Sequence, residues 1–284
     1  MPPLRSESLR VSRESDDPAS GVRGGDLRAQ VPSFTMLGVR VDGLTTESLY
    51  RAIAEAVESG RPTVIGNHNL HSIYLYHRDA KMRRFYARAR YVFIDGMPLV
   101  WLGRLLGYPL RREHRMTSID WLRPMLPAAV SRGWRLFLLG SGPEVAERSA
   151  ALLRSEFPGL QVEAMHGFFD LRPGSTSGEA VLAHLREYHP DVLCVGMGMP
   201  RQEHWIEDHI DRLDAGVVLN LGGFMELLTG EIPLPPRWIS RVGLEWLVRL
   251  LSRPRRVWRR YLVEPWFLLP LLARDLRARW GGSG

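Results

Sequence analysis

One acidic residue stands alone in the apolar stretch of residues 89–107, ARYVFIDGMPLVWLGRLLG. Asp95 follows a run over 91–94 that reads as a buried strand, and Gly96 precedes an apolar helical run over 97–106. A carboxylate at a partly desolvated strand end suits general base catalysis. An acid at the same place can instead cap the helix that follows. The residues alone leave both roles of Asp95 open.

Polar or glycine-rich turns also follow the other apolar runs. Glycines let a backbone approach a ligand closely, and the N-termini of the following helices favour anions. The turn GSGPEV lacks the third glycine of the dinucleotide motif, and the chain has no Walker loop. Several such turns at successive strand ends still indicate a nucleotide or phosphate ligand. The residues expected to contact it are Asn67, Gly96, Gly140, Gly142, Gly196 and Gly198.

Short apolar runs alternate with longer helical patterns from about residue 36 onward. This order predicts crossover connections, and therefore a Rossmann-like, mainly parallel sheet with helices on both faces. In such sheets ligands bind beyond the carboxyl ends of the strands. The expected strands are 63–67, 91–95, 135–140, 161–167, 192–198 and 216–223. The expected helices are 45–58, 69–87, 98–106, 119–131, 143–156, 178–188, 201–212 and 224–229.

The chain's charge is concentrated near its C-terminus. The 284 residues are 45% hydrophobic and 24% charged, which is typical of a globular protein, with a formal net charge of +7. Residues 241–280 hold ten arginines and three acids, a balance of +7 that equals the charge of the whole chain. Residues 1–34 are polar and lack periodicity, so we interpret them as a flexible tail.

The basic C-terminal segment also carries apolar and aromatic residues. Leucines at 244, 247, 250 and 251 form a helical stripe, and tryptophans follow at 246, 258, 266 and 280. This pattern favours an amphipathic helix at an anionic membrane surface, although a packed helix pair with solvated arginines would look similar. No run reaches the length of a spanning helix, no signal peptide is visible, and the lone Cys194 suits a reducing compartment. We expect a cytoplasmic protein, peripheral at the inner face of the plasma membrane.

Metal and nucleic-acid binding have little support in the sequence. No Asp-x-Asp motif stands at a strand end, and the Asp-x-x-Asp pairs at 208–211 and 211–214 fall in a predicted helical region. The histidines do not match a zinc motif. The basic segment lacks a reading helix or an aromatic sheet motif for nucleic acid. We therefore expect no metal, no cofactor and no nucleic-acid partner.

Six segments, in order and spacing, resemble the WecG/TagA/CpsF family of bacterial glycosyltransferases over residues 36–262. They are IDGMPLVWLGRLLG, LFLLGSGPEVAERSA, FPGLQVEAMHGFF, PDVLCVGMGMPRQEHWI, NLGGFMELLTG and GLEWLVRLLSRPRRVWRRY. The resemblance implies a Rossmann-like domain plus a C-terminal appendage. It also implies an N-acetylmannosaminyltransferase-like hexosyltransferase that moves a sugar from a nucleotide donor, such as a UDP-sugar, to a polyprenyl-diphosphate-linked saccharide in cell-envelope polysaccharide or exopolysaccharide synthesis.

The resemblance assigns roles by position. Asp95 matches the family's general base, although a role as a ligand of a substrate hydroxyl stays open. The substrate-binding positions implied are Asn67, Gln202 with its neighbour Glu203, and the appendage arginines Arg249, Arg256 and Arg259. Departures occur at Ile65, Ser118, Leu234 and Arg253, so the donor sugar does not follow from the family pattern.

The sequence thus predicts a tail over 1–34, a Rossmann-like glycosyltransferase domain over 35–235 and a helical, membrane-associating appendage over 236–284. The predicted reaction is inverting. It is also predicted to be metal-independent, because backbone amides and arginines, which bind phosphate oxygens bidentately, can stabilise the leaving diphosphate. The alternative function is a non-catalytic nucleotide-binding module with a basic membrane-binding tail. Self-association into a homo-oligomer is left open.

Overall fold

The structure is a computed structural model that describes residues 26–233, 239, 245–252 and 254–280. Its centre is a six-stranded parallel sheet with the strand order β4-β3-β8-β7-β5-β6. The predicted Rossmann-like, parallel architecture is confirmed. The strands are β3 (Thr63–His68), β4 (Tyr91–Ile94), β5 (Arg135–Gly140), β6 (Gln161–Met165), β7 (Val192–Gly196) and β8 (Val217–Asn220).

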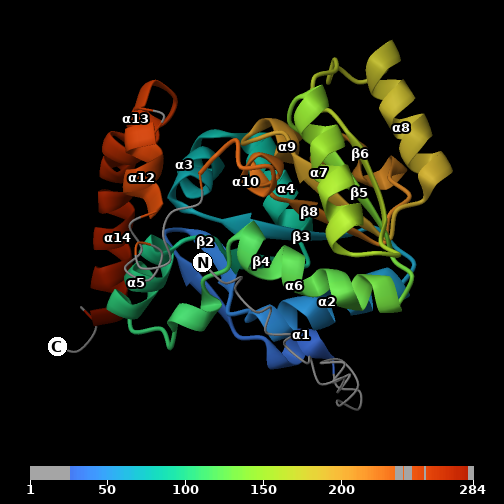
Figure 1. Cartoon of the computed structure of the whole chain (residues 1–284). Helices are drawn as coiled ribbons and strands as arrows, with labels where there is room; N and C mark the ends of the chain where they lie inside the picture. Colours follow the sequence, from blue (N-terminus) through green and yellow to red (C-terminus); the bar gives the residue numbers. More distant parts are fainter. Residues whose placement is uncertain (1–25, 234–238, 240–244, 253, 281–284) are drawn as a thin grey trace, which may run out of the picture.

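Helices cover both faces of this sheet (Figure 1). One apolar core lies between the sheet and α2 (Thr46–Glu58), α6 (Ser118–Ser131), α7 (Pro143–Glu156) and α10 (Phe224–Leu228). A second core lies on the other face, under α4 (Ala80–Arg88), α8 (Thr176–Tyr188) and α9 (Arg201–His209), which the short helix η2 (Ile210–Arg212) follows. The strands read as continuous apolar runs because both of their faces are buried.

The connections bring all six strand ends to one edge of the sheet. Three connections lead to a strand that lies nearer the β4 edge: β3 to β4, β6 to β7 and β7 to β8. They run over the sheet face that carries α4, α8 and α9. The other two connections, β4 to β5 and β5 to β6, lead toward the β6 edge and run over the opposite face, which carries α6 and α7. This is the pattern that a constant crossover handedness requires. The chain therefore places the turns after the strands side by side.

A two-stranded antiparallel hairpin precedes the main sheet and was not predicted. It consists of β1 (Ser33–Met36) and β2 (Val39–Asp42), joined by Leu37 and Gly38 at φ values of 52° and 74°. A short helix, α1 (Leu27–Gln30), lies in the segment predicted as a tail, and its first turn is capped by the Asp26 side chain. Leu27 is buried in the first core, which explains why the chain is ordered here.

The long helix predicted over 69–87 is two helices. The first is α3 (Leu70–Arg78) and the second is α4, with Asp79 in extended conformation between them. The Asp79 carboxylate accepts from the backbone N–H groups of Lys81 and Met82 at 2.7 and 3.2 Å. Because aspartate is a strong N-cap residue, it starts a new helix in the middle of the predicted one.

Helices at the C-terminus pack along the β4 edge of the molecule (Figure 1). They are α12 (Glu245–Ser252), α13 (Pro254–Leu262) and α14 (Glu264–Trp280). In α14, Leu268 is buried in a third core with the hairpin, α3 and α5 (Met97–Leu105), which the short helix η1 (Arg112–His114) follows. Phe267 packs edge-on against Tyr74 of α3, and the Asp275 carboxylate accepts from the Leu37 backbone N–H at 2.5 Å. These contacts fix α14 to the main domain.

Within these described ranges, no helix combines the length and the apolarity that crossing a membrane requires.

Candidate functional site

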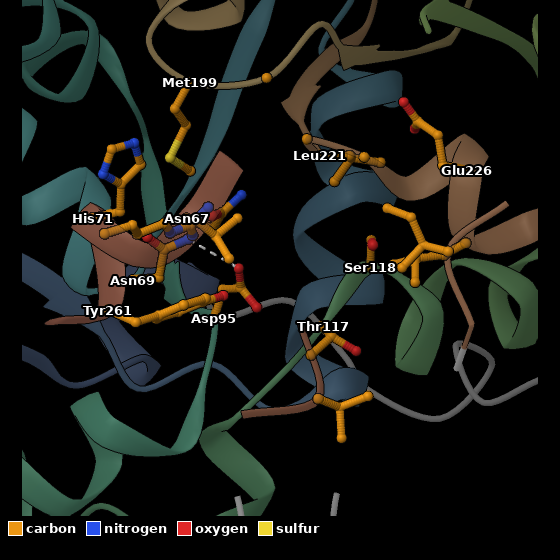
Figure 2. Close-up of a pocket in the computed structure, with 18 of the residues that line it drawn as sticks. Asn67, Asn69, His71, Asp95, Thr117, Ser118, Met199, Leu221, Glu226 and Tyr261 are labelled. Atoms are coloured by element: carbon orange, nitrogen blue, oxygen red, sulfur yellow. Dashed lines mark hydrogen bonds between the residues drawn. The ribbon is translucent and has the colours of Figure 1, made fainter. Parts of the chain in front are cut away.

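A cavity of about 350 Å³ lies beyond the carboxyl ends of β3, β4 and β8. One wall comes from these strand ends and the turns after β7 and β8, and another comes from α13 and the start of α14. Figure 2 shows His71 and Met199 on one side of this space and Glu226 and Ser118 on the other. The sequence-predicted residues that line it are Asn67, Asp95, Gly198 and Arg259.

Asp95 enters the cavity directly after β4. Its backbone N–H donates to the carbonyl of His68 at 2.8 Å, which continues the strand pairing by one residue. Its carboxylate accepts from Asn69 Nδ2 at 3.2 Å, as Figure 2 shows. The N-cap of α5 is Gly96, and no side chain caps that helix. Asp95 is therefore not a helix cap, and it lines the cavity.

Gly96 makes this geometry possible. Its φ of 115° is strained for residues with a side chain, and it lets the chain turn sharply from β4 into α5. The turn leaves the Asp95 side chain half-buried at the cavity. The glycine next to the acid thus serves the placement of that acid.

A buried polar network lies beneath the cavity floor. Gln202 Oε1 accepts from the backbone N–H groups of Gly198 at 3.2 Å and Gly222 at 3.0 Å. Gln202 Nε2 donates to Glu203 Oε1 at 2.7 Å, and Asn220 Nδ2 donates to the same oxygen at 2.7 Å. Gln202 and Glu203 are fully buried. They join the turn after β7 to the end of β8, and their predicted contact with a substrate stays a prediction.

Glu203 carries one unusual feature. Its Oε2 atom is buried and has no hydrogen-bond partner in the described part of the chain. Burial raises the pKa of Glu203, and hydrogen bonds from Gln202 and Asn220 oppose that shift. Glu203 therefore has one carboxylate oxygen that is bonded within the network and one without a partner among the described residues.

Asn67 connects this network to the cavity. Its Nδ2 donates to Asn220 Oδ1 at 3.2 Å and also to the Asn220 backbone carbonyl. The Tyr86 hydroxyl donates to the Asn67 carbonyl at 2.8 Å. Asn67 is 5% exposed and lines the cavity, so only a small part of this side chain is open to a ligand.

The predicted glycines fall into two groups. A Cβ on Gly140 would lie 2.2 Å from the Gly196 carbonyl oxygen, and one on Gly196 would lie 2.6 Å from that of Gly222. These glycines allow neighbouring strand ends to approach each other. Gly198 has a φ of 80°, and a Cβ added there would meet no atom within 4 Å; a Cβ on Gly142 would lie 3.8 Å from the Phe168 ring. Of the two, only Gly198 lines the cavity.

The C-terminal helices contribute charge to the cavity. Arg259, Arg260 and Tyr261 of α13 line it, and Glu264 begins α14 at its rim. His71 Nδ1 lies 2.6 Å from Glu264 Oε2, so α3 and α14 meet at the cavity wall. Arg249 and Arg256 were also predicted here. Their helices are described, but their side chains lie outside the described residues.

Several lining residues were missed in the sequence. Asn69 and His71 follow Asn67 in the polar run GNHNLH, which directly follows a buried strand and could have indicated them. Ser118 begins α6 and enters the cavity because Met116 donates its backbone N–H to the Ile94 carbonyl at 2.9 Å. Glu226 had no comparable signal. It lines the cavity with its buried Oε2 unpartnered among the described residues.

The departures from the family pattern have different surroundings. Ile65 is fully buried in β3 and does not line the cavity, whereas Ser118 does. Leu234 and Arg253 lie outside the described residues.

Acidic and histidine side chains of the described segments do not form a group of three or more that could hold a metal ion. Of the Asp-x-x-Asp pairs, Asp208 lies in α9 and Asp211 in η2, as predicted, whereas Asp214 lies beyond η2 and outside any helix. Asp208 and Asp211 form ion pairs with α4. Asp208 pairs with Lys81 at 2.6 Å and Asp211 with Arg88 at 2.8 Å.

Comparisons with known proteins show a family and similar relatives. The sequence model of the Glycosyl transferase WecG/TagA/CpsF family matches residues 34–281. Three similar relatives come from Staphylococcus aureus strains MW2, NCTC 8325 and MRSA252. Each is named N-acetylglucosaminyldiphosphoundecaprenol N-acetyl-beta-D-mannosaminyltransferase. Each is 28% identical over 203 residues, which cover 72% of this chain and 74% of the relative.

Proposed function

Because the chain belongs to the WecG/TagA/CpsF family of glycosyl transferases, we propose that it moves a hexosyl group from a nucleotide-sugar donor to a saccharide on a polyprenyl diphosphate. The donor we propose is a UDP-sugar. The named activity of the relatives, transfer to N-acetylglucosaminyldiphosphoundecaprenol, supports the acceptor class. The product would serve the synthesis of a cell-envelope polysaccharide or exopolysaccharide.

One observation carries the proposal: Asp95 and Arg259 line the same cavity at the carboxyl ends of parallel strands. A carboxylate and a guanidinium group supply the two charges that glycosyl transfer needs. The base removes the proton of the acceptor hydroxyl, and the cation stabilises the diphosphate that leaves.

In the proposed reaction, the Asp95 carboxylate takes the acceptor proton. The acceptor oxygen forms a bond to the anomeric carbon while the bond from that carbon to the donor's diphosphate oxygen breaks. A single displacement of this kind inverts the anomeric centre. Among the described residues, only Asn69 Nδ2 hydrogen-bonds the Asp95 carboxylate. The carboxylate oxygens therefore keep lone pairs that can accept the proton of the acceptor hydroxyl.

We propose that arginines neutralise the leaving diphosphate. Arg259 and Arg260 line the cavity, and guanidinium groups bind phosphate oxygens bidentately. Arg249 and Arg256 are proposed to join them. This assignment predicts that transfer does not depend on a divalent metal. We further propose that Asn67, Gln202 and the glycine turns shape the pocket for the donor.

The test is an assay of the purified chain with a panel of nucleotide sugars and a lipid-linked N-acetylglucosaminyl diphosphate. We expect one donor to give an inverted product at a rate that a metal chelator does not change. Donor binding without transfer would favour the non-catalytic nucleotide-binding module. A retained anomeric configuration would contradict the single displacement.

Two arginines of α13 provide a matched pair of variants. Both are exposed, but Arg259 lines the cavity and Arg255 does not. Arg259→Ala should raise the donor KM or lower kcat by about tenfold or more, the effect of one charge-assisted hydrogen bond, and Arg255→Ala should change neither. Equal effects of the two substitutions would contradict the proposed role of Arg259.

We also propose that residues 35–235 form the catalytic domain and 236–284 an appendage that holds the protein at the inner face of the plasma membrane. Large apolar side chains on the appendage helices are exposed, including Trp266 at 71% and Leu251 at 73%. Arginines lie on the same helices. Exposed aromatic and basic residues together suit an interface with anionic lipids.

A further inference from the structure

A second pocket lies at the far end of α5. It is open, measures about 440 Å³, and is lined mainly by Arg104, Tyr108, Arg111 and Arg112. None of its lining residues lines the cavity at the strand ends. The pocket is therefore a separate feature of the surface.

The three arginines are available for a ligand. Arg104, Arg111 and Arg112 are exposed, and none of these guanidinium groups forms an ion pair or hydrogen bond with another described residue. The acid beside them, Glu113, is also exposed and unpaired among the described residues. With three arginines and one acid, this surface has a net positive charge, which favours the binding of an anion.

The end of α14 extends the same positive surface. The Arg279 guanidinium lies 4.1 Å from the centre of the Tyr108 ring, and its Nη2 is 3.5 Å from the Gly107 carbonyl oxygen. The Trp280 ring is close enough that a Cβ on Gly107 would lie 3.3 Å from it. Trp280 itself is 62% exposed. The pocket thus joins a turn of the main domain to the last turn of α14.

Apolar side chains border the arginines. Trp101 and Leu105 of α5 are 43% and 54% exposed, and their i, i+4 spacing puts them on one face of the helix. Arg104 belongs to the same helix. Tryptophan is enriched where membrane proteins meet lipid headgroups, and arginine near the surface is attracted to anionic lipids. This combination distinguishes the pocket from a site for a soluble anion.

We propose that the pocket binds the phosphate of an anionic phospholipid headgroup while Trp101, Leu105 and Trp280 enter the interface. The inference rests on the proposed function, because an enzyme with a lipid-linked acceptor must meet a membrane. It adds a contact made by the main domain to those of the appendage helices. Since α5 has nine residues and starts beside Asp95, the headgroups would lie about 13 Å along the helix from the proposed base.

Vesicle binding tests the proposal. The full-length chain is sedimented with vesicles of phosphatidylcholine alone and of phosphatidylcholine with phosphatidylglycerol. The test variant is R104Q/R111Q/R112Q. The control is R61Q/R154Q/R186Q, which removes the same charge from three exposed arginines outside the pocket. Thermal unfolding of both variants checks that they fold.

We expect the test variant to bind phosphatidylglycerol vesicles roughly 10- to 100-fold more weakly than wild type, since each surface arginine contributes separately to such binding. The control should change by less than about threefold. Wild-type binding by the test variant, or equal losses in both variants, would overturn the site.

Turnover separates this inference from the proposed function. With a short-chain acceptor in solution, R104Q/R111Q/R112Q should keep wild-type activity because its residues lie outside the catalytic cavity. If the wild-type chain transfers no sugar from any donor, the proposed function fails. The vesicle comparison still decides the lipid site in that case.

Discussion

Two carboxylic acids lie near the same strand ends in opposite surroundings. Asp95 is half-buried at the cavity and accepts one side-chain hydrogen bond, from Asn69. Glu203 is fully buried and accepts from Gln202 and Asn220. The first is open to a ligand in the cavity and is our proposed base, whereas the second is bonded to Gln202, the residue that accepts from the turns at Gly198 and Gly222.

The buried position of Glu203 gives a pH-dependent prediction. Burial raises its pKa in the folded state above the ordinary value of 4.5. The folded protein therefore binds this proton more tightly than the unfolded chain. The corresponding stability is fully present below the unfolded pKa and decreases as the pH rises toward the folded pKa.

Glu203→Gln removes this titration and keeps the shape of the side chain. The free energy of unfolding of the variant, relative to wild type, should therefore increase as the pH rises above about 4.5. Urea unfolding of both proteins across that pH range measures it. A difference that stays constant with pH would mean that the Glu203 pKa is not raised.

The candidate site residues were easier to single out in the sequence than their surroundings. Asp95 was singled out because it is the one acid in an apolar stretch at a strand end, and it lines the cavity in the structure. The burial of Gln202 was not visible, because it depends on Gly198 and Gly222, which belong to turns after two different strands. Contacts between distant parts of the chain leave no local pattern in the sequence.

At the scale of elements, the buried strands and their helices were predicted well because their apolar periodicity is strong. The break at Asp79 was missed, since helical periodicity continues on both sides of it and only the cap ends the helix. The hairpin β1–β2 was missed because its strands, SFTM and VRVD, mix polar and apolar residues and form no continuous apolar run. Its partners, α5 and α14, are far away in the sequence.

One leucine of α14 is buried in the third core. Leu268 is 4% exposed in the third core, whereas its neighbour Leu269 is 50% exposed. Leu268→Ala should destabilise the docking of α14 by about 2–4 kcal/mol, because it leaves a cavity in a packed site. Leu269→Ala should cost less than about 1 kcal/mol.

Amide hydrogen exchange measures the effect locally. In Leu268→Ala, exchange in α14 should increase while β7 and β8 stay protected. Since Glu264 of α14 lies at the cavity rim, transfer activity should fall with the loss of protection. Unchanged exchange in α14 would show that Leu268 does not hold this helix.

At the scale of the whole molecule, α12, α13 and α14 lie along the edge that also carries α5 (Figure 1). Most of the exposed large apolar side chains belong to these helices, which also carry many arginines. The C-terminal excess of arginine was evident in the sequence. That the main domain adds α5 to this edge was not, because it requires the packing of α14 against the hairpin and α3.

This arrangement predicts which aromatic residue matters for membrane contact. Trp266 of α14 is 71% exposed, and Phe168, near the far end of the sheet beside β6, is 69% exposed. Trp266→Ser should weaken sedimentation with phosphatidylglycerol vesicles by about tenfold, because it removes an aromatic anchor from the interface. Phe168→Ser is the control of equal exposure and should bind as wild type does. Equal binding by both variants would contradict the proposed orientation.

The most direct test of the central claim is the transfer rate of Asp95→Asn in a single turnover with saturating nucleotide sugar and lipid-linked acceptor. The substitution keeps the size of the side chain and its place beside Asn69, and it removes the group that would take the proton. The account predicts a rate about 10²- to 10⁴-fold below wild type, with donor affinity within about threefold. A rate near that of wild type would contradict it.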